Sequence, residues 1–130
     1  MTARFFLAGA AALALLCGPA LATDYVNGAI KTAEIGGKMV LTDAKGMTLY
    51  TFDKDTAGVT NCYDKCAVNW PPVLAEKDAV ADGAFTLVDR TDGTKMWAHD
   101  GMPLYLWIKD TKAGDVTGDG VGGVWHTALD

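Results

Sequence analysis

Residues 46–55 read GMTLYTFDKD and residues 101–110 read GMPLYLWIKD, so one pattern occurs twice at an offset of 55 positions. Chance would rarely keep a single register over a stretch of this length. The chain therefore contains an internal duplication, which is the strongest indication of its architecture. At the same offset and without a gap, further identical residues coincide: Trp70 with Trp125, and Leu74 with Leu129.

Each copy begins with the pattern of a β-hairpin, in which two β-favouring runs flank a turn that contains glycine. The expected strands and turns are 38–42, 43–46 and 47–52 in the first copy, and 84–88, 95–98, 99–101 and 102–108 in the second. Only residues 61–67 and 75–81 have a briefly helical pattern, and both are too short to be stable alone. The sequence predicts an all-β fold, a single compact domain of two pseudo-symmetric antiparallel repeats (about 38–75 and 93–130), with a short helical or irregular loop that contains the cysteines.

Length and composition exclude several classes of protein. With 130 residues the chain is too short for a TIM barrel or a two-domain enzyme. A formal net charge of −5 argues against nucleic-acid binding, which needs a basic surface. Half of the residues are hydrophobic, so the chain is too apolar to be intrinsically disordered.

Residues 1–22 have the pattern of a secretory signal peptide. Arg4 precedes an apolar run over 5–16, and Ala20-Leu21-Ala22 is a suitable cleavage site. The run is shorter than the roughly 20 residues that a membrane span requires. We therefore expect no transmembrane segment and a single periplasmic or secreted domain over 23–130. Lipid attachment at Cys17 is the less favoured alternative, because Leu16 stands where a small residue is usual.

The two copies share the motif Tyr-x-(Phe/Trp)-x-x-Asp. With the segments 62–67 (CYDKCA) and 70–72 (WPP), this motif resembles the secreted-repeat family of predicted bacterial lipoproteins, whose function is unknown. The resemblance covers essentially all of the chain after residue 22 and implies an exported envelope protein without an assigned reaction.

The repeated motif has two interpretations. Residues two apart on a strand share a face, so its aromatic side chains point together and its aspartate lies in the loop that follows. They form either the core that the repeats share or an aromatic pocket with two carboxylates. The residues concerned are Tyr50, Phe52 and Asp55 in the first copy, and Tyr105, Trp107 and Asp110 in the second.

Cys62 and Cys66 are expected to form a disulfide, because an even pair of cysteines in an exported protein is usually oxidised. Their spacing matches neither the Cys-x-x-Cys of thioredoxins nor the haem-attachment motif. We expect no cofactor; the alternative is copper, bound by the two thiolates together with methionine or histidine. The candidates for that role are His99, His126, Met47 and Met102.

Residues 115–120 (DVTGDG) resemble the first half of a calcium loop, with oxygen ligands at Asp115, Thr117 and Asp119. The twelfth position, which needs a bidentate carboxylate, is His126, so a glycine-rich turn is the preferred interpretation.

No pattern indicates catalysis, and the chain after residue 22 contains no serine that could act as a nucleophile. The sequence favours a non-catalytic binding or interaction module in the envelope, with a small ligand or a protein partner that it does not identify. The alternative is a periplasmic redox or copper-handling protein that uses Cys62 and Cys66.

Overall fold

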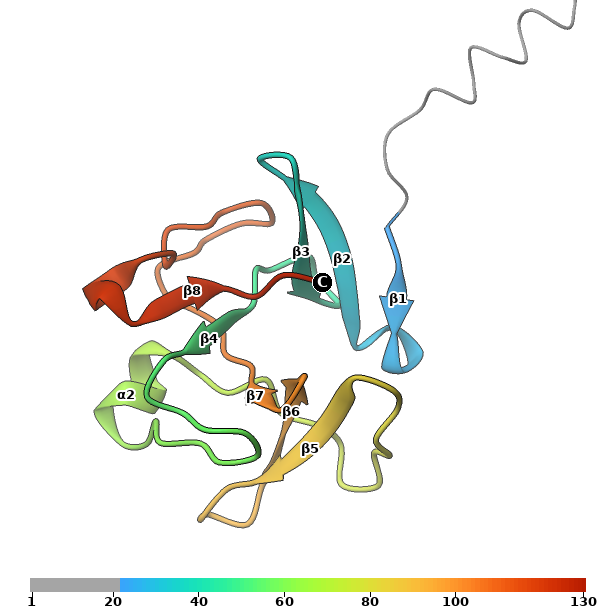
Figure 1. The fold of residues 1–130 in the computed structure, drawn as a ribbon, viewed down its shortest axis with the longest axis vertical. Helices are drawn as coiled ribbons and strands as arrows, with labels where there is room; N and C mark the ends of the chain where they lie inside the picture. Colours follow the sequence, from blue (N-terminus) through green and yellow to red (C-terminus); the bar gives the residue numbers. More distant parts are fainter. Residues whose placement is uncertain (1–21) are drawn as a thin grey trace, which may run out of the picture.

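The computed structural model describes residues 22–130, and the expected signal peptide lies outside them except for Ala22. Over residues 22–130 the fold is mostly β, with three small antiparallel sheets and one α-helix (Figure 1). The elements in chain order are β1 (Asp24–Tyr25), η1 (Val26–Gly28), β2 (Ile30–Ile35), β3 (Lys38–Asp43), β4 (Tyr50–Phe52), α2 (Lys65–Asn69), β5 (Phe85–Asp89), β6 (Lys95–His99), β7 (Met102–Pro103), η2 (Val121–Gly123) and β8 (Trp125–Thr127).

The sheets are β1-β2-β3, β4-β8 and β5-β6-β7. Between β3 and β4, Thr42 pairs with Thr48, so the chain returns beside β3 as the first hairpin pattern predicts. Gly46, in the turn, has a φ of +87°, which glycine adopts at no steric cost. The all-β expectation is confirmed.

The two copies have corresponding hairpins. The β2–β3 hairpin pairs Ile30 with Asp43, and the β5–β6 hairpin pairs Phe85, the counterpart of Ile30, with His99, which lies one position beyond the counterpart of Asp43. Next to β4 the offset holds without a shift: Tyr50 pairs with Thr127, and Tyr105 pairs with Pro72, the counterpart of Thr127. β4 of the first copy therefore pairs with β8 of the second, so the copies are joined by strand pairing rather than by surface contact alone (Figure 1).

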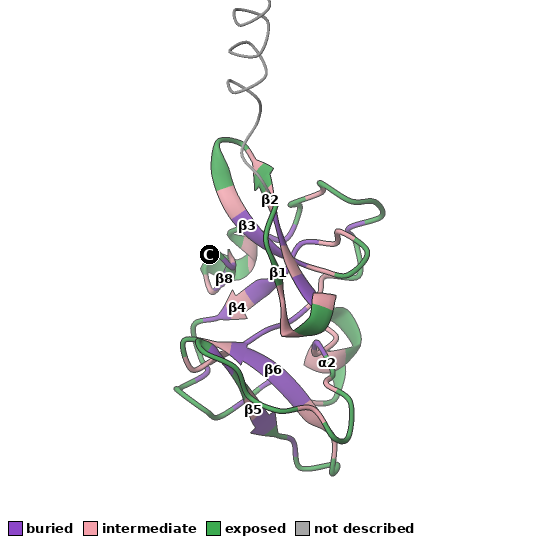
Figure 2. Cartoon of the chain, turned by 90° about the vertical axis from the view of Figure 1, so that its right-hand side faces the viewer, coloured by how far each residue is buried: buried purple, intermediate pink, exposed green. Residues whose placement is uncertain are grey.

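The interior consists of two clusters of buried side chains. One surrounds Tyr50, Tyr105 and the tryptophans of the β4–β8 region. The other contains Leu41, Leu104 and Trp97, and it packs between the two hairpins. Figure 2 shows buried residues along β4 and β6, where these clusters lie.

Several elements differ from the sequence prediction. The expected strand over 102–108 pairs regularly only at β7, because Pro103 has no N–H and the chain then crosses to other partners. The helix begins at Lys65 rather than 61, and 75–81 contains one turn instead of a helix, because Leu74 and Asp82 on either side make strand-type bridges. β1, β2 and β8 were not predicted. Among the described residues, no helix has the length and hydrophobicity of a membrane span.

Candidate functional site

Each motif tyrosine is hydrogen-bonded to the motif aspartate of the opposite copy. The Tyr50 hydroxyl donates to Asp110 Oδ2 at 2.6 Å, and the Tyr105 hydroxyl donates to Asp55 Oδ2 at 2.6 Å. All four side chains are buried. The motif residues thus form a reciprocal network inside the protein, and the network crosses between the repeats.

The second oxygen of each carboxylate is held by the loop that follows it. Asp55 Oδ1 accepts a hydrogen bond from the Asn61 N–H at 2.7 Å. Asp110 Oδ1 accepts bonds from the N–H and the hydroxyl of Thr117, at 3.0 and 2.6 Å. For Asp55, burial and these hydrogen bonds have opposite effects on the pKa of the carboxyl.

Burial has electrostatic consequences for three members of this network. The pKa values of Tyr50 and Tyr105 are raised, first by burial and then by the aspartate that each hydroxyl contacts. Burial also raises the pKa of Asp55, although its bonds to Tyr105 and the nearby charge of Arg90 oppose that rise. The tyrosines are consequently neutral hydrogen-bond donors at neutral pH.

The aromatic residues beside this network form one continuous stack of four rings. Phe52 stacks on Trp125 with centroids 4.2 Å apart, and Trp125 stacks on Trp70 at 3.8 Å. Trp70 then stacks on Trp107 at 4.0 Å. Phe52 is equivalent to Trp107, and Trp70 to Trp125, so the stack is symmetric about its centre. The sequence showed the offset of Trp70 and Trp125 but gave no sign that their rings meet.

The disulfide between Cys62 and Cys66 is present, with an S–S distance of 2.04 Å. Beside it lies a buried cation that sequence reasoning missed. Arg90 donates to the Cys62 carbonyl at 3.1 Å, and its guanidinium lies 4.5 Å from the ring centre of Tyr63. This arginine joins the disulfide loop to the turn after β5, a role that the sequence alone did not indicate.

The candidate copper ligands are distributed over different elements. His99 and Met102 are register partners on β6 and β7. His126 lies on β8 with Nε2 2.8 Å from Asp53 Oδ2, and Met47 follows the first hairpin turn. In the part of the chain that the structure describes, no three His, Cys, Asp or Glu side chains gather as metal ligands would.

The calcium-like loop uses its oxygen atoms within the protein. The Asp115 carboxylate binds Lys112 Nζ at 2.6 Å, and Asp119 Oδ1 accepts the Thr127 N–H at 2.9 Å. Thr117 is bonded to Asp110, as described above. The three side chains therefore hold the loop in place and do not converge on one point.

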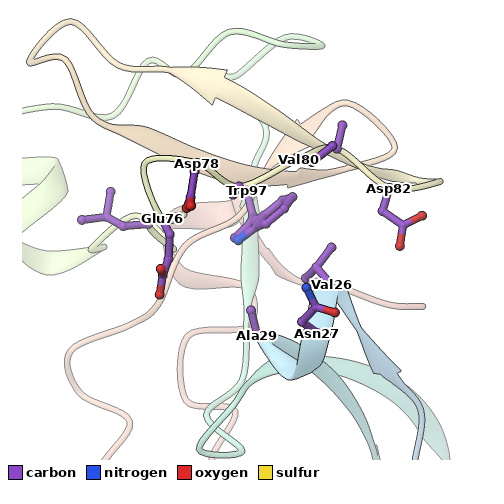
Figure 3. A pocket seen from close by; sticks show the side chains of 11 residues that line it. Val26, Asn27, Ala29, Glu76, Asp78, Val80, Asp82 and Trp97 are labelled. Carbon is purple, nitrogen blue, oxygen red and sulfur yellow. The ribbon is translucent and has the colours of Figure 1, made fainter.

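A pocket of about 770 Å³ lies between η1 and the segment that precedes β5. Its floor is the indole of Trp97, which is 4% exposed, and its walls carry the carboxylates of Glu76, Asp78 and Asp82 (Figure 3). Val80 at the rim is 77% exposed. Sequence reasoning missed this site, because its acidic residues lie in a segment with no motif.

The three carboxylates of the pocket have no basic partner, since none of the ion pairs within residues 22–130 includes them. The Trp97 indole N–H likewise has no acceptor among those residues, and Figure 3 shows its nitrogen on the side of Glu76 and Asp78. Buried N–H groups normally have a partner. The pocket thus offers negative charge and one free donor.

Comparison with known protein families gives one match. The model of a family described as a secreted repeat of unknown function matches residues 31–74 and again residues 86–129. The two matches are offset by 55 positions, as the duplicated motif is, and begin ahead of the expected repeat starts at 38 and 93. No curated protein and no solved structure is significantly similar to the chain.

Proposed function

The chain belongs to the family described as a secreted repeat of unknown function, and on this premise we propose that it is an exported, non-catalytic binding module for a small organic cation. The observation that carries the proposal is the pocket over Trp97, whose volume of about 770 Å³ lies in the range of small-molecule sites. Its walls combine apolar surface with a few polar groups, as such sites do.

The charge of the ligand follows from the three unpaired carboxylates. Glu76, Asp78 and Asp82 surround one concave surface, where like charges raise the local concentration of cations. The chain as a whole is also acidic, with a formal net charge of −5. A cationic ligand would relieve the mutual repulsion of these side chains, whereas an anion would add to it.

The uncharged part of the ligand is inferred from the apolar walls of the pocket and from Trp97. Leu74 and Val80 are 56% and 77% exposed at the pocket, so an apolar group of the ligand would bury them. Trp97 is almost completely covered, and therefore contributes apolar contact and its N–H rather than an open ring face. We expect a ligand that joins a positive charge to an apolar group and carries a hydrogen-bond acceptor.

Calorimetry with defined probes tests this proposal. Benzyltrimethylammonium, spermidine and the methyl ester of arginine represent organic cations, and benzyl alcohol is the uncharged comparison. At least one cation should bind and benzyl alcohol should not. The double variant Glu76→Gln/Asp78→Asn should lose binding, while Glu34→Gln, an exposed residue of β2 away from the pocket, should keep it.

Several results would contradict the proposal. They are equal binding of the charged and uncharged probes, binding that survives the loss of Glu76 and Asp78, or no binding of any cation. Native mass spectrometry of protein exported to the periplasm adds an independent measurement. A copper adduct there would support the copper-handling alternative with Cys62 and Cys66.

A further inference from the structure

The rings of the four-ring stack lie closer together than most aromatic pairs do. The planes of Trp70 and Trp125 are inclined by 3° at a centroid distance of 3.8 Å, and those of Trp70 and Trp107 by 25° at 4.0 Å. Aromatic pairs in proteins prefer offset or edge-to-face arrangements with centroids about 4.5–7 Å apart. Rings that lie face to face at such short distances couple more strongly than offset or edge-to-face pairs and can share a positive charge.

We propose that this stack conducts a one-electron oxidising equivalent from Trp107, at the protein surface, through Trp70 to Tyr50. Trp107 is half-buried, whereas Trp70 is buried and contacts Trp107 at 4.0 Å. A one-electron oxidant at the surface therefore reaches Trp107 first. The chain would act as an electron donor to oxidising radicals or oxidised metal complexes outside the cell membrane.

The composition of the stack gives the route one redox-active end. An indole ring is oxidised by one electron much more readily than a benzene ring, and a phenol is oxidised readily when its proton can leave. Trp107 occupies one end, while its equivalent in the first copy, at the other end, is Phe52. The duplication is thus symmetric in shape but not in chemistry, and only the end at Trp107 accepts the oxidising equivalent.

Tyr50 completes the route. Its ring meets Trp70 edge-on at 5.4 Å, and its hydroxyl donates to Asp110 Oδ2 at 2.6 Å. When the Trp70 radical cation takes an electron from Tyr50, the O–H bond breaks and the proton moves to the Asp110 carboxylate. The products are reduced oxidant, neutral Trp107 and Trp70, a neutral Tyr50 radical and protonated Asp110, so charge and electrons balance.

Tyr105 is the less suitable end point, although it contacts Trp125 edge-on at 5.1 Å and is bonded to Asp55. The Arg90 guanidinium lies close enough to Asp55 to stabilise its ionised form, and it contacts Thr60, whose hydroxyl is bonded to that of Tyr105. A fixed positive charge opposes both the one-electron oxidation of Tyr105 and the transfer of its proton to Asp55. No such cation contacts the Tyr50–Asp110 pair in the described part of the chain.

Laser flash–quench oxidation tests the proposal with photogenerated ruthenium(III) tris-bipyridine as the oxidant. The protein has four tyrosines and four tryptophans. Tyr25 and Tyr63 are partly exposed and would react directly, so both are replaced by Phe in the parent variant. Transient absorption and electron paramagnetic resonance then distinguish a tryptophan radical from a tyrosine radical.

In this parent we expect a tryptophan radical that decays into a tyrosine radical, and the second step should slow in deuterium oxide because a proton moves. Trp107→Leu should lower the yield of the tyrosine radical several-fold, and Tyr50→Phe should abolish most of it. Tyr105→Phe removes the other tyrosine hydroxyl of the buried network and should leave the yield unchanged.

Trp107 is only half-buried, so Trp107→Leu should fold even if Tyr50→Phe is unstable. Circular dichroism checks that the variant is folded. An unchanged tyrosine-radical yield in Trp107→Leu would overturn the route. A radical that stays on tryptophan in the parent, or one that Tyr105→Phe removes and Tyr50→Phe does not, would overturn Tyr50 as the end point.

Discussion

Tyr50 and Tyr105 exchange both of their backbone hydrogen bonds: the Tyr50 N–H donates to the Tyr105 carbonyl at 2.8 Å, and the Tyr105 N–H donates to the Tyr50 carbonyl at 2.9 Å. These residues are equivalent in the two copies, so the axis that relates the copies passes between them. Their hydroxyls then reach Asp110 and Asp55, each in the opposite copy. Neither copy satisfies its own motif, so we expect the two to unfold as one unit.

The first prediction concerns the motif hydroxyls. Tyr50→Phe or Tyr105→Phe leaves a buried carboxylate oxygen without its donor, which should lower the free energy of unfolding by about 1–3 kcal/mol. Replacement by Ala also creates a cavity and should cost about 3–5 kcal/mol. Urea denaturation measures both, and one cooperative transition is expected throughout.

Tyr25→Phe is the matched control, because its hydroxyl donates to the exposed Asp130 at 3.0 Å. Its stability should stay close to that of the wild type. A loss at Tyr105 no larger than at Tyr25 would show that the network contributes little to stability.

A second prediction concerns the buried arginine. Arg90→Met removes a charged donor from the Cys62 carbonyl and should destabilise the protein by about 2 kcal/mol. Lys95→Met, which breaks an exposed ion pair with Asp89, should cost less than about 1 kcal/mol. Denaturation at neutral pH compares the two variants, and equal losses would contradict the structural role of Arg90.

The same variant has a pH signature. Burial raises the pKa of Asp55, so the stability linked to its protonation is present at low pH and is lost as pH rises through the folded-state pKa. Arg90 opposes that rise, and its removal should raise the pKa of Asp55 further. The destabilisation by Arg90→Met should therefore be smaller in acid than at neutral pH.

The disulfide supplies a third prediction. It closes a loop whose chain entropy corresponds to about 2 kcal/mol. Reduction, or Cys62→Ala together with Cys66→Ala, should lower stability by that order without unfolding the protein. Because the backbone N–H of Trp70 donates to the Cys66 carbonyl at 2.7 Å, tryptophan fluorescence should also change on reduction. Complete unfolding would mean that the loop supports the stack more than chain entropy implies.

The fourth prediction concerns a loss of stability in acid that is due to Asp115. The bonds to Lys112 and to the Thr111 N–H lower the pKa of this carboxyl to about 2. A lowered folded-state pKa stabilises the fold above the usual aspartate range, and the contribution disappears as pH falls toward 2. Asp115→Asn should therefore be less stable than the wild type at neutral pH, and the difference should narrow in acid. A difference independent of pH would exclude this mechanism.

The duplication was the part of the fold that sequence alone predicted best, because an offset is visible without knowing any contact. The hairpin at 38–52 was predicted for the same reason, since alternation and a glycine turn are local signals. β2 was missed although Ile30 and Thr32 point inward, because the polar Lys31 and Glu34 interrupt the run. β8 was missed because Trp125–Thr127 is short and pairs with a strand 75 residues earlier in the chain.

The candidate sites depend on contacts that a linear sequence does not encode. The motif places Tyr50 and Asp55 in the same copy, but it does not show that the Tyr50 hydroxyl donates to Asp110 of the other copy. Glu76 and Asp78 come from a segment, 75–81, whose pattern was interpreted as helical, so their position beside Trp97 was not visible. Only the disulfide was predicted in full, because compartment and cysteine count determine it.

The last prediction tests the stacked geometry itself. Gly118 approaches the rings so closely that an added Cβ would lie 2.9 Å from Trp70 and 3.0 Å from Tyr50. Its φ is not positive, so Gly118→Ala introduces no backbone strain and acts only by pressing on the rings. Crowding of this kind typically costs about 1–3 kcal/mol. We expect a loss of that size together with a change in the exciton signal of Trp70 and Trp125 in circular dichroism, because exciton coupling depends on the distance and orientation of the two rings.

Val116→Ala is the matched control, since this exposed residue of the same loop does not contact the stack. Its stability and its exciton signal should both remain close to those of the wild type. If Gly118→Ala kept the exciton signal unchanged while losing stability, the crowding would act on Tyr50 and not on the arrangement of the tryptophans.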